Sequence, residues 1–256
     1  LKNFASLSRT TMNKIAIIIP SRLNAQRLPN KPLKLINNKE MILHVYEAAV
    51  RSKVGEVYIA TPDQKIIDFI KNAKGNVVKT SNKHETGTDR IFEVFKDALN
   101  NEPDIIINLQ GDMPNIKPQA ISDLVSYMKQ GKCDIGTLAS EFKSEDELRN
   151  SNVVKVAVKE KLSGNIFLNA LDFCRIYKNS KNYLYHHVGI YAFTSKALIK
   201  YVTLKRTKLE LERKLEQLRA LENNMAIHVG YIKSSPLSVD TEEDLIEVKK
   251  IMENKK

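Results

Sequence analysis

The sequence has few of the features that mark disulfide-bonded or membrane-spanning proteins. Its 256 residues include only two cysteines, Cys133 and Cys174, which are too few for a disulfide framework and lack metal-ligand spacing. No apolar run approaches the roughly 20 residues that a membrane-spanning helix needs. Because a chain of this length can bury a core without disulfides, we expect a globular protein of the reducing cytoplasm with no membrane insertion.

The first thirteen residues lack the continuous apolar segment of a signal peptide. They read LKNFASLSRTTMN, with basic and hydroxyl side chains throughout, and Met12 stands just before the first predicted strand. We therefore predict that residues 1–13 are a poorly ordered N-terminal extension. Residues 14–256 are predicted to form a single domain.

Acidic residues are too few to balance the basic ones. The 41 Lys and Arg residues against 30 Asp and Glu give a net charge of +11, which would suit nucleic acid, an acidic membrane surface or small anionic substrates. The lysines are scattered along the whole chain, and no aromatic RNA-binding strand motif accompanies them. We interpret the excess as solvated surface charge and predict no nucleic-acid partner, with a basic nucleic-acid-binding protein as the alternative.

Short aliphatic runs alternate with amphipathic segments in the first half of the chain. Strands are predicted at residues 15–19, 57–60, 77–79 and 104–109, and helices at 41–52, 64–73, 89–99 and 119–129. This alternation is typical of βαβ units. We therefore predict an α/β fold with a mostly parallel central sheet and helices on both faces.

The second half has a less regular pattern. Strands are predicted at residues 134–141, 153–158, 188–193 and 227–232, and helices at 208–222 and 241–252. The first of these helices carries an apolar stripe of Leu211, Leu215, Leu218 and Leu221. Residues 159–182 are rich in Lys and Asn, and we predict an insertion or lid there.

A basic loop follows the first predicted strand, where an open α/β sheet binds its ligands. The loop reads PSRLNAQRLPNKPL (residues 20–33) and holds Arg22, Arg27 and Lys31 within ten residues, with two prolines that stiffen it. Three such cations suit a triphosphate, since they offset charge on a departing pyrophosphate. A basic surface loop explains these residues equally well. The glycines of a Walker loop or a dinucleotide fingerprint are absent, which disfavours an ATPase or a dehydrogenase.

Two aspartates are candidate magnesium ligands. Asp112 follows the strand at residues 104–109 within Gln110-Gly111-Asp112, and Asp240 stands just before the last predicted helix. Magnesium typically takes one or two carboxylates together with phosphate oxygens and water. Each aspartate is also explained as a turn or helix-capping residue, so the residues alone leave both roles open.

Eight segments occur in the order typical of one enzyme family. They are PSRLNAQRLPNKPL (20–33), YIATPD (58–63), HETGTDR (84–90), QGDMP (110–114), NVVKV (152–156), HVGIYAF (187–193), LEQLRALE (215–222) and VDTEEDL (239–245). Together they resemble the 3-deoxy-manno-octulosonate cytidylyltransferases, or CMP-Kdo synthetases, over nearly the whole chain. The resemblance implies a Rossmann-like nucleotide-diphospho-sugar transferase fold. It also implies a Mg²⁺-dependent homodimer that transfers CMP from CTP to the acid sugar Kdo, releasing pyrophosphate, in lipopolysaccharide biosynthesis.

The resemblance also implies a role for each candidate site residue. It gives a catalytic set of Arg22, Lys31, Asp112 and Asp240; a CTP set of Arg22, Arg27, Lys31, His84, Thr86, Gly87, Arg90 and Gln110; a metal set of Asp112 and Asp240; and a sugar set of Arg175, His187, Tyr191, Glu216 and Gln217. Without the resemblance, His187 is better explained as a hydrogen-bonded strand-end histidine and Glu216 as a solvated helix residue. No covalent enzyme intermediate is implied, because positioning and charge stabilisation do most of the catalysis in such transfers.

The sequence departs from the family pattern in three places. Met113 replaces the glutamate of the usual QGDEP, the segment ALDFCR (170–175) replaces ALYFSR, and Asn30 replaces a glycine. Asparagine still tolerates left-handed backbone angles. The departures leave two alternatives open, which are a cytidylyltransferase for another acid sugar, of the sialic acid or amino-Kdo type, and a non-catalytic nucleotide-binding relative.

Overall fold

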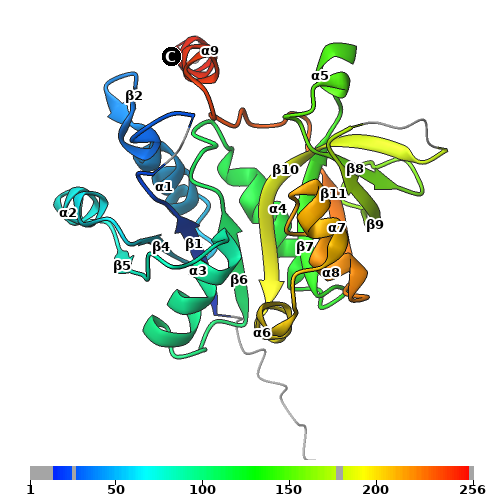
Figure 1. The fold of residues 1–256 in the computed structure, drawn as a ribbon, viewed down its shortest axis with the longest axis horizontal. Coiled ribbons are helices and arrows are strands. Elements are labelled where there is room, and N and C mark those ends of the chain that lie inside the picture. The colour runs from blue at the N-terminus through cyan, green and yellow to red at the C-terminus, as the bar shows by residue number, and fades with distance from the viewer. Residues whose placement is uncertain (1–13, 25–26, 177–180, 254–256) are drawn as a thin grey trace, which may run out of the picture.

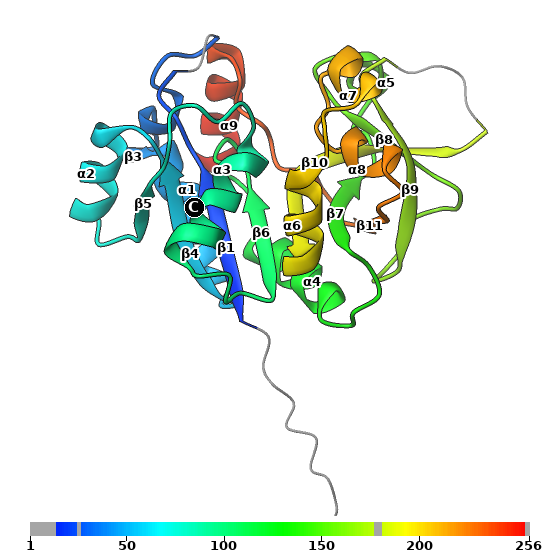
Figure 2. The same cartoon turned by 60° about the horizontal axis from the view of Figure 1, so that its bottom comes forward.

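A nine-stranded sheet forms the centre of the protein. The computed structural model describes residues 14–24, 27–176 and 181–253, so the predicted extension at residues 1–13 lies outside the described residues. The strand order is β5-β4-β1-β6-β10-β7-β11-β9-β8, and helices flank the sheet on both sides (Figures 1 and 2). In the described chain, β9 and β10 run against the other seven strands of this sheet. The predicted α/β fold is confirmed.

The first half of the sheet consists of parallel strands. They are β1 (Ile15–Pro20), β4 (Glu56–Thr61), β5 (Val77–Lys79) and β6 (Ile105–Leu109). β1 and β6 are aliphatic and buried along almost their whole length, as expected of strands covered on both faces. A small hairpin of β2 (Leu35–Ile36) and β3 (Lys39–Glu40) lies beside them.

Helices pack on both faces, so β1 contributes to two separate cores. Ile17 and Ile19 face one core and Ile18 the other, since side chains alternate along a strand. The helices on the first face are α1 (Met41–Arg51), α2 (Gln64–Asn72) and α4 (Pro118–Met128). Those on the second face are α3 (Gly87–Glu93), its π-helical continuation (Val94–Ala98) and α6 (Ser195–Thr203).

The second half of the sheet closes on itself. Its strands are β7 (Ile135–Ser140), β8 (Lys155–Val158), β9 (Phe167–Cys174), β10 (Tyr183–Thr194) and β11 (Ile227–Tyr231). The last residues of β10 pair with β6 and β7, whereas its first residues pair with β8. Because β8 also pairs with β9, β9 with β11 and β11 with β7, these five strands form a closed circuit of pairings.

The segment 159–182, predicted to be an insertion or lid, contributes β9 to this circuit. Ala170 and Phe173 of β9 are buried, while Asn169 and Leu171, on either side of Ala170, are exposed. The strand was not predicted because Lys and Asn are frequent around it and its two buried residues are three positions apart, so it lacks the two-residue period of a half-buried strand. Residues 177–180 of the predicted lid lie outside the described residues.

The prediction of one helix over residues 208–222 is wrong. The chain forms two short helices, α7 (Lys208–Arg213) and α8 (Leu218–Glu222), and Lys214 between them is left-handed with φ 54° and ψ 48°. Leu215 and Leu218 are buried, but Leu211 is 53% exposed. The four leucines therefore do not lie on one face of one helix.

The helices α5 (Glu145–Arg149) and α6 of the described chain were not predicted, whereas the C-terminal helix α9 (Glu242–Glu253) was predicted. The short α5 buries no residue, so it has no apolar period, and α6 starts directly after β10 with Thr194 as its N-cap. Among the described residues, no helix is long and apolar enough to cross a membrane.

Candidate active site

A cavity of about 630 Å³ lies where β1 and β6 end. Its walls come from the first loop, the start of α3, the turn after β6 and the segment before α9. Ten of its lining residues are the ones predicted to bind CTP or metal: Arg22, Arg27, Lys31, His84, Thr86, Gly87, Arg90, Gln110, Asp112 and Asp240. These residues come from four separate parts of the chain and line one cavity, which we call the nucleotide cavity.

The first loop is held so that its cations line this cavity. Asn30 is left-handed, with φ 56° and ψ 25°, and leads into a short 3₁₀ turn, Lys31–Leu33. The departure from glycine is thus tolerated as predicted. Leu28 is buried in a small core with Val239 and Leu245, which ties the loop to the segment before α9. The same core therefore places Lys31 and Asp240 side by side.

Lys31 joins the two predicted metal ligands. Its Nζ lies 3.0 Å from Asp112 Oδ2 and 3.0 Å from Asp240 Oδ1, and Arg27 lies 3.0 Å from Asp240 Oδ2. The backbone amide of Val239 also donates to the carbonyl of Asp112 at 2.9 Å. The carboxylates of Asp112 and Asp240 therefore converge on one point, as expected of a shared metal site.

The charges around Asp240 alter its titration. Burial raises the pKa of Asp240, but Lys31, Arg27 and Arg175 lower it by more, so the net shift is downward. Burial lowers the pKa of Lys31, and the two aspartates outweigh this effect and raise it. Both groups are consequently charged at neutral pH.

The donor set fits magnesium bound together with a nucleotide. Within the described residues, no group of three or more His, Cys, Asp or Glu side chains is arranged to hold a metal ion. Two converging carboxylates are nevertheless what magnesium uses when phosphate oxygens and water complete its shell. A metal ion held by Asp112 and Asp240 would therefore need ligands from a bound triphosphate.

Buried contacts fix the wall formed by the HETGTDR segment. Arg90 is only 4% exposed and donates to Thr80 Oγ1 at 2.5 Å and to the Ser81 carbonyl at 2.9 Å. Burial and, next, the charge of Arg22 lower the pKa of Arg90. His84 pairs with Glu93, and Thr86 caps α3 by accepting from an amide. These side chains hold the cavity wall as well as line it.

A second cavity of about 260 Å³ adjoins the first. Gln110 lines both, and we call the second one the acceptor cavity. The predicted cluster of His187, Tyr191, Glu216 and Gln217 lines it. Glu216 and Gln217 stand in the break between α7 and α8 rather than on a helix. Of the two cavities, Asp240 lines only the nucleotide cavity.

The floor of the acceptor cavity is aromatic and uncharged. His187 is buried, and burial, followed by the nearby His186, lowers its pKa to about 3. Thr137 donates to the Ile190 carbonyl at 2.7 Å, so its oxygen is left to accept from Nε2 of His187 at 3.0 Å. Burial raises the pKa of Tyr191 well above its usual value. The buried Tyr191 hydroxyl has Thr137 nearby but no well-formed hydrogen bond within the described chain.

Two of the predicted sugar residues, Glu216 and Arg175, make contacts with other parts of the protein. Glu216 accepts from the Thr88 hydroxyl at 2.8 Å, and burial raises the pKa of Glu216. Arg175 lines neither cavity in the described structure, and its guanidinium contacts the carbonyls of Ser151 and Asn152 at 3.4 and 3.5 Å. Its charge still contributes to the low pKa of Asp240. Arg175 is therefore a neighbour of the site rather than part of the lining.

Several lining residues were missed from the sequence. Ser21 lines the nucleotide cavity, and its buried hydroxyl has no hydrogen-bond partner in the described chain. Thr88 and Asn108 line the acceptor cavity. A signal for Asn108 was present, because it is the one polar residue in the strand IIINL. Ser21 gave no comparable signal beyond its place in the basic loop.

Comparisons with known proteins agree with this site. The family model described as cytidylyltransferase matches residues 16–227. Proteins named 3-deoxy-manno-octulosonate cytidylyltransferase from Brucella ovis and Brucella anthropi are 42% and 41% identical over 234 residues, which is 91% of this chain and 93% and 94% of theirs. The chain belongs to the cytidylyltransferase family. The predicted resemblance and the predicted enzyme class, a nucleotidyltransferase, are confirmed.

Solved structures extend the comparison for this cytidylyltransferase. A structure described as CMP:2-keto-3-deoxy-manno-octonic acid synthetase complexed with CTP is 35% identical, with a TM-score of 0.85 over 95% of this chain and 100% of that one. A 4-diphosphocytidyl-2C-methyl-D-erythritol synthase from Anaerococcus prevotii is 16% identical, with a TM-score of 0.63 over 94% and 99% of the two chains. The second likeness is one of fold alone.

Proposed function

We propose that this cytidylyltransferase transfers CMP from CTP to Kdo with Mg²⁺ and releases pyrophosphate. The observation that carries the proposal is the pair of adjoining cavities that share Gln110. One cavity contains the cations and carboxylates that a metal-bound triphosphate needs. The other contains hydrogen-bonding groups that include His187, Tyr191 and Gln217, together with Lys214 and Glu216. The names of the Brucella relatives and the CTP complex of the similar synthetase support this choice of substrates.

The proposed chemistry needs no nucleophile from the protein. The anomeric hydroxyl of Kdo attacks the α-phosphorus of CTP and gives up its proton to water, a new phosphorus–oxygen bond forms, and the bond from the α-phosphorus to the bridging oxygen of the β-phosphate breaks to release pyrophosphate. Arg22 and Lys31 stabilise the negative charge that grows on the departing pyrophosphate. A Mg²⁺ ion held by Asp112 and Asp240 would supply further charge neutralisation at the phosphates. Holding both substrates across Gln110 provides the alignment that such a transfer requires.

The acceptor cavity suits a neutral, hydroxyl-rich face of a sugar. With a pKa of about 3, His187 is uncharged at neutral pH, as is Tyr191, whose pKa burial raises. Uncharged donors and acceptors bind hydroxyl groups without adding charge close to the reacting phosphate. The buried Tyr191 hydroxyl is a candidate contact for one of them, since leaving it unpaired is costly.

Another acid sugar, of the sialic acid or amino-Kdo type, is the second candidate. It is favoured by the altered segment at residues 170–175, in which Asp172 pairs with Arg213 at 2.6 Å and Arg175 lies outside the cavity lining. A non-catalytic relative has less support. Met113, which suggested it together with the altered region at residues 159–182, is 3% exposed and packs in the core on the α1 and α4 face.

The cellular setting is part of the proposal. We propose a cytoplasmic homodimer with a role in lipopolysaccharide biosynthesis and no nucleic-acid partner. Both cysteines are free thiols, which suits a reducing compartment. The dimer rests on the family resemblance alone. Light scattering during size exclusion would test it, since a mass of one chain, 29.1 kDa, would contradict it.

A panel assay of pyrophosphate release tests the proposed reaction. The enzyme is incubated with CTP, Mg²⁺ and either Kdo, an amino-Kdo, a sialic acid or no sugar. We expect pyrophosphate only when Kdo is present, and none when EDTA is added or ATP replaces CTP. Release with sialic acid or amino-Kdo but not with Kdo would establish the second candidate. No release with any sugar would contradict both.

A further inference from the structure

The segment that carries Glu216 and Gln217 is not held in place by regular secondary structure. It lies between α7, of six residues, and α8, of five. Helices this short have little stability of their own, because the cost of nucleation is shared by few hydrogen bonds. The left-handed Lys214 adds a backbone conformation that non-glycine residues adopt reluctantly. Other contacts must therefore fix this break.

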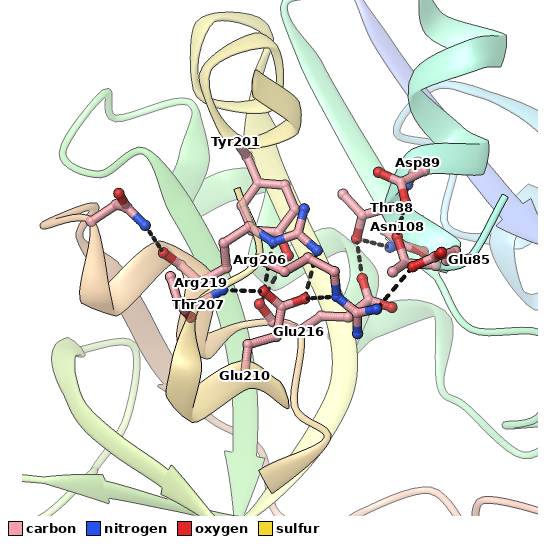
Figure 3. A network of polar contacts seen from close by, with 12 residues as sticks. Glu85, Thr88, Asp89, Asn108, Tyr201, Arg206, Thr207, Glu210, Glu216 and Arg219 are labelled. Atoms are coloured by element: carbon pink, nitrogen blue, oxygen red, sulfur yellow. Dashed lines mark hydrogen bonds and ion pairs between the residues drawn. The ribbon is translucent and has the colours of Figure 1, made fainter. Parts of the chain in front are cut away.

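A buried ion pair links the two helices across the break. Arg219 of α8 donates from Nε to Glu210 Oε2 at 2.8 Å and from its terminal nitrogen to Glu210 Oε1 at 2.6 Å (Figure 3). Glu210 of α7 is 0% exposed and Arg219 is 3% exposed. Two parallel contacts from a planar guanidinium fix orientation as well as distance. The pair therefore sets how α7 and α8 are arranged on either side of the break.

The same pair is joined to the backbone of Glu216. Tyr201 lies under the Arg219 guanidinium, 4.7 Å from its ring centre, and donates its hydroxyl to the Glu216 carbonyl at 2.9 Å. The Glu216 side chain is held from the other side by Thr88 at 2.8 Å. Figure 3 shows this path running from Glu210 through Arg219 and Tyr201 to Glu216 and Thr88. Fixing the arginine thus helps to fix Glu216.

The pair is also joined to the wall of the nucleotide cavity. Arg206 donates from Nε to Glu210 Oε1 at 3.1 Å and from a terminal nitrogen to Glu85 Oε2 at 2.9 Å. Glu85 lines the nucleotide cavity. Because Arg206 and Glu85 are 42% and 71% exposed, this contact contributes little by itself. The buried Glu210–Arg219 pair is the firm part of the network.

Stability alone does not account for such a pair. Burying two charges costs hydration free energy, and their mutual attraction barely offsets that cost. Replacing both with apolar residues is therefore often neutral or stabilising. Removing only one is strongly destabilising. What the charges provide that methionines do not is a single fixed geometry. A double replacement therefore separates positioning from folding.

We propose that Glu210 and Arg219 are positioning residues for the acceptor cavity. In the described structure neither lines either cavity. Their pair holds the break between α7 and α8 so that Glu216 and Gln217 line the acceptor cavity in the geometry needed to bind the acceptor. The inference rests on the proposed function only for the identity of that acceptor, taken as Kdo.

The test is the double variant Glu210→Met/Arg219→Met, with Lys208→Met/Glu212→Met as control. The control removes an exposed ion pair from α7 itself, 3.8 Å long, that has no part in the network. We expect the double variant to keep its KM for CTP and to melt somewhat below the wild type, because Glu210 also closes the capping box of α7 with Thr207. Its KM for Kdo should rise by about tenfold or more, since small misplacements of binding groups are costly. The control should match the wild type in every respect.

Two further measurements make the outcome decisive. Hydrogen exchange of residues 214–218 without substrate should be faster in the double variant than in the control. Arg219→Lys keeps the charge but loses the bidentate contact, so it should give a smaller rise in the KM for Kdo. This variant replaces the double variant as the test if the double variant does not fold. Wild-type exchange and a wild-type KM for Kdo in these variants would overturn the proposal. If exchange is faster in the double variant but the wild-type enzyme does not use Kdo, the positioning role is supported and the proposed function is contradicted.

Discussion

The ammonium group of Lys31 lies 3.0 Å from a carboxylate oxygen of Asp112, although 81 residues separate them in the chain. The same ammonium lies 3.0 Å from Asp240. A lysine thus balances two carboxylates that are proposed to bind metal. Since the described residues include no group of three or more His, Cys, Asp or Glu side chains that could hold a metal ion, metal binding is expected to depend on the nucleotide.

The first prediction is that CTP tightens metal binding. Two carboxylates already paired with Lys31 bind Mg²⁺ weakly, whereas triphosphate oxygens complete the coordination shell. Titration with Mn²⁺, followed by electron paramagnetic resonance, should give a Kd about tenfold or more lower with CTP than without it. Asp240→Asn should lose this effect. Glu242→Gln, which removes a carboxylate outside the cavity lining, should keep it. Equal metal affinity with and without CTP would contradict the two-carboxylate site.

The second prediction concerns the loop cations. Arg22→Ala or Lys31→Ala should lower kcat by about tenfold or more, because each removes a positive charge near the developing pyrophosphate. Thermal unfolding should change little, since neither Arg22 nor Lys31 belongs to the two main cores. The matched control is Lys34→Ala, a nearby cation that pairs with Glu242 and does not line the cavity. Wild-type turnover in both loop variants would show that the loop is a basic surface loop with no part in catalysis.

Local rules and site chemistry predicted part of this structure well. The resemblance pointed to Asn30, where the family has a glycine, and to Asp112 with Asp240 as a pair, whereas the residues alone left both aspartate roles open. The backbone angles that asparagine tolerates and the ligands that magnesium needs then made a left-handed Asn30 and converging carboxylates the expected geometry. By contrast, no feature of the sequence indicated that β10 lies between β6 and β7, or that β7 to β11 form a closed circuit of pairings.

The break at Lys214 shows why the rest was not predictable. Leucines at regular spacing and good helix formers favour one continuous helix over residues 208–222. Lys214 is not a residue type that marks a helix end, and the contacts that favour the break come from the side chains of Glu210, Arg219 and Tyr201. Such contacts exist only after the fold has formed. Tertiary contacts therefore outweighed the local preference for one continuous helix.

The third prediction concerns stability against acid. Burial lowers the pKa of folded His187 to about 3, against 6.5 when the chain is unfolded. The unfolded chain therefore binds more protons between these values, so this contribution to stability is complete above pH 6.5 and is lost as the pH falls toward 3. The free energy of unfolding should fall by up to about 1.4 kcal/mol per pH unit from this residue. Urea unfolding measured across this pH range should show a shallower slope for His187→Gln than for the wild type. An unchanged slope in His187→Gln would contradict a buried neutral imidazole.

The fourth prediction separates acceptor binding from packing at two adjacent residues. Gln217 lines the acceptor cavity, whereas Leu218 is 1% exposed in the core. Gln217→Ala should raise the KM for Kdo by about tenfold while leaving that for CTP nearly unchanged, because it removes a hydrogen bond to the acceptor alone. Leu218→Ala should instead lower the free energy of unfolding by about 2–5 kcal/mol through a cavity, with no selective effect on either KM. Steady-state kinetics with each substrate varied in turn, beside chemical unfolding, measures both. If Gln217→Ala raises both KM values equally, the acceptor cavity is wrongly assigned, because a residue that contacts only the acceptor has no means of weakening CTP binding to the same extent.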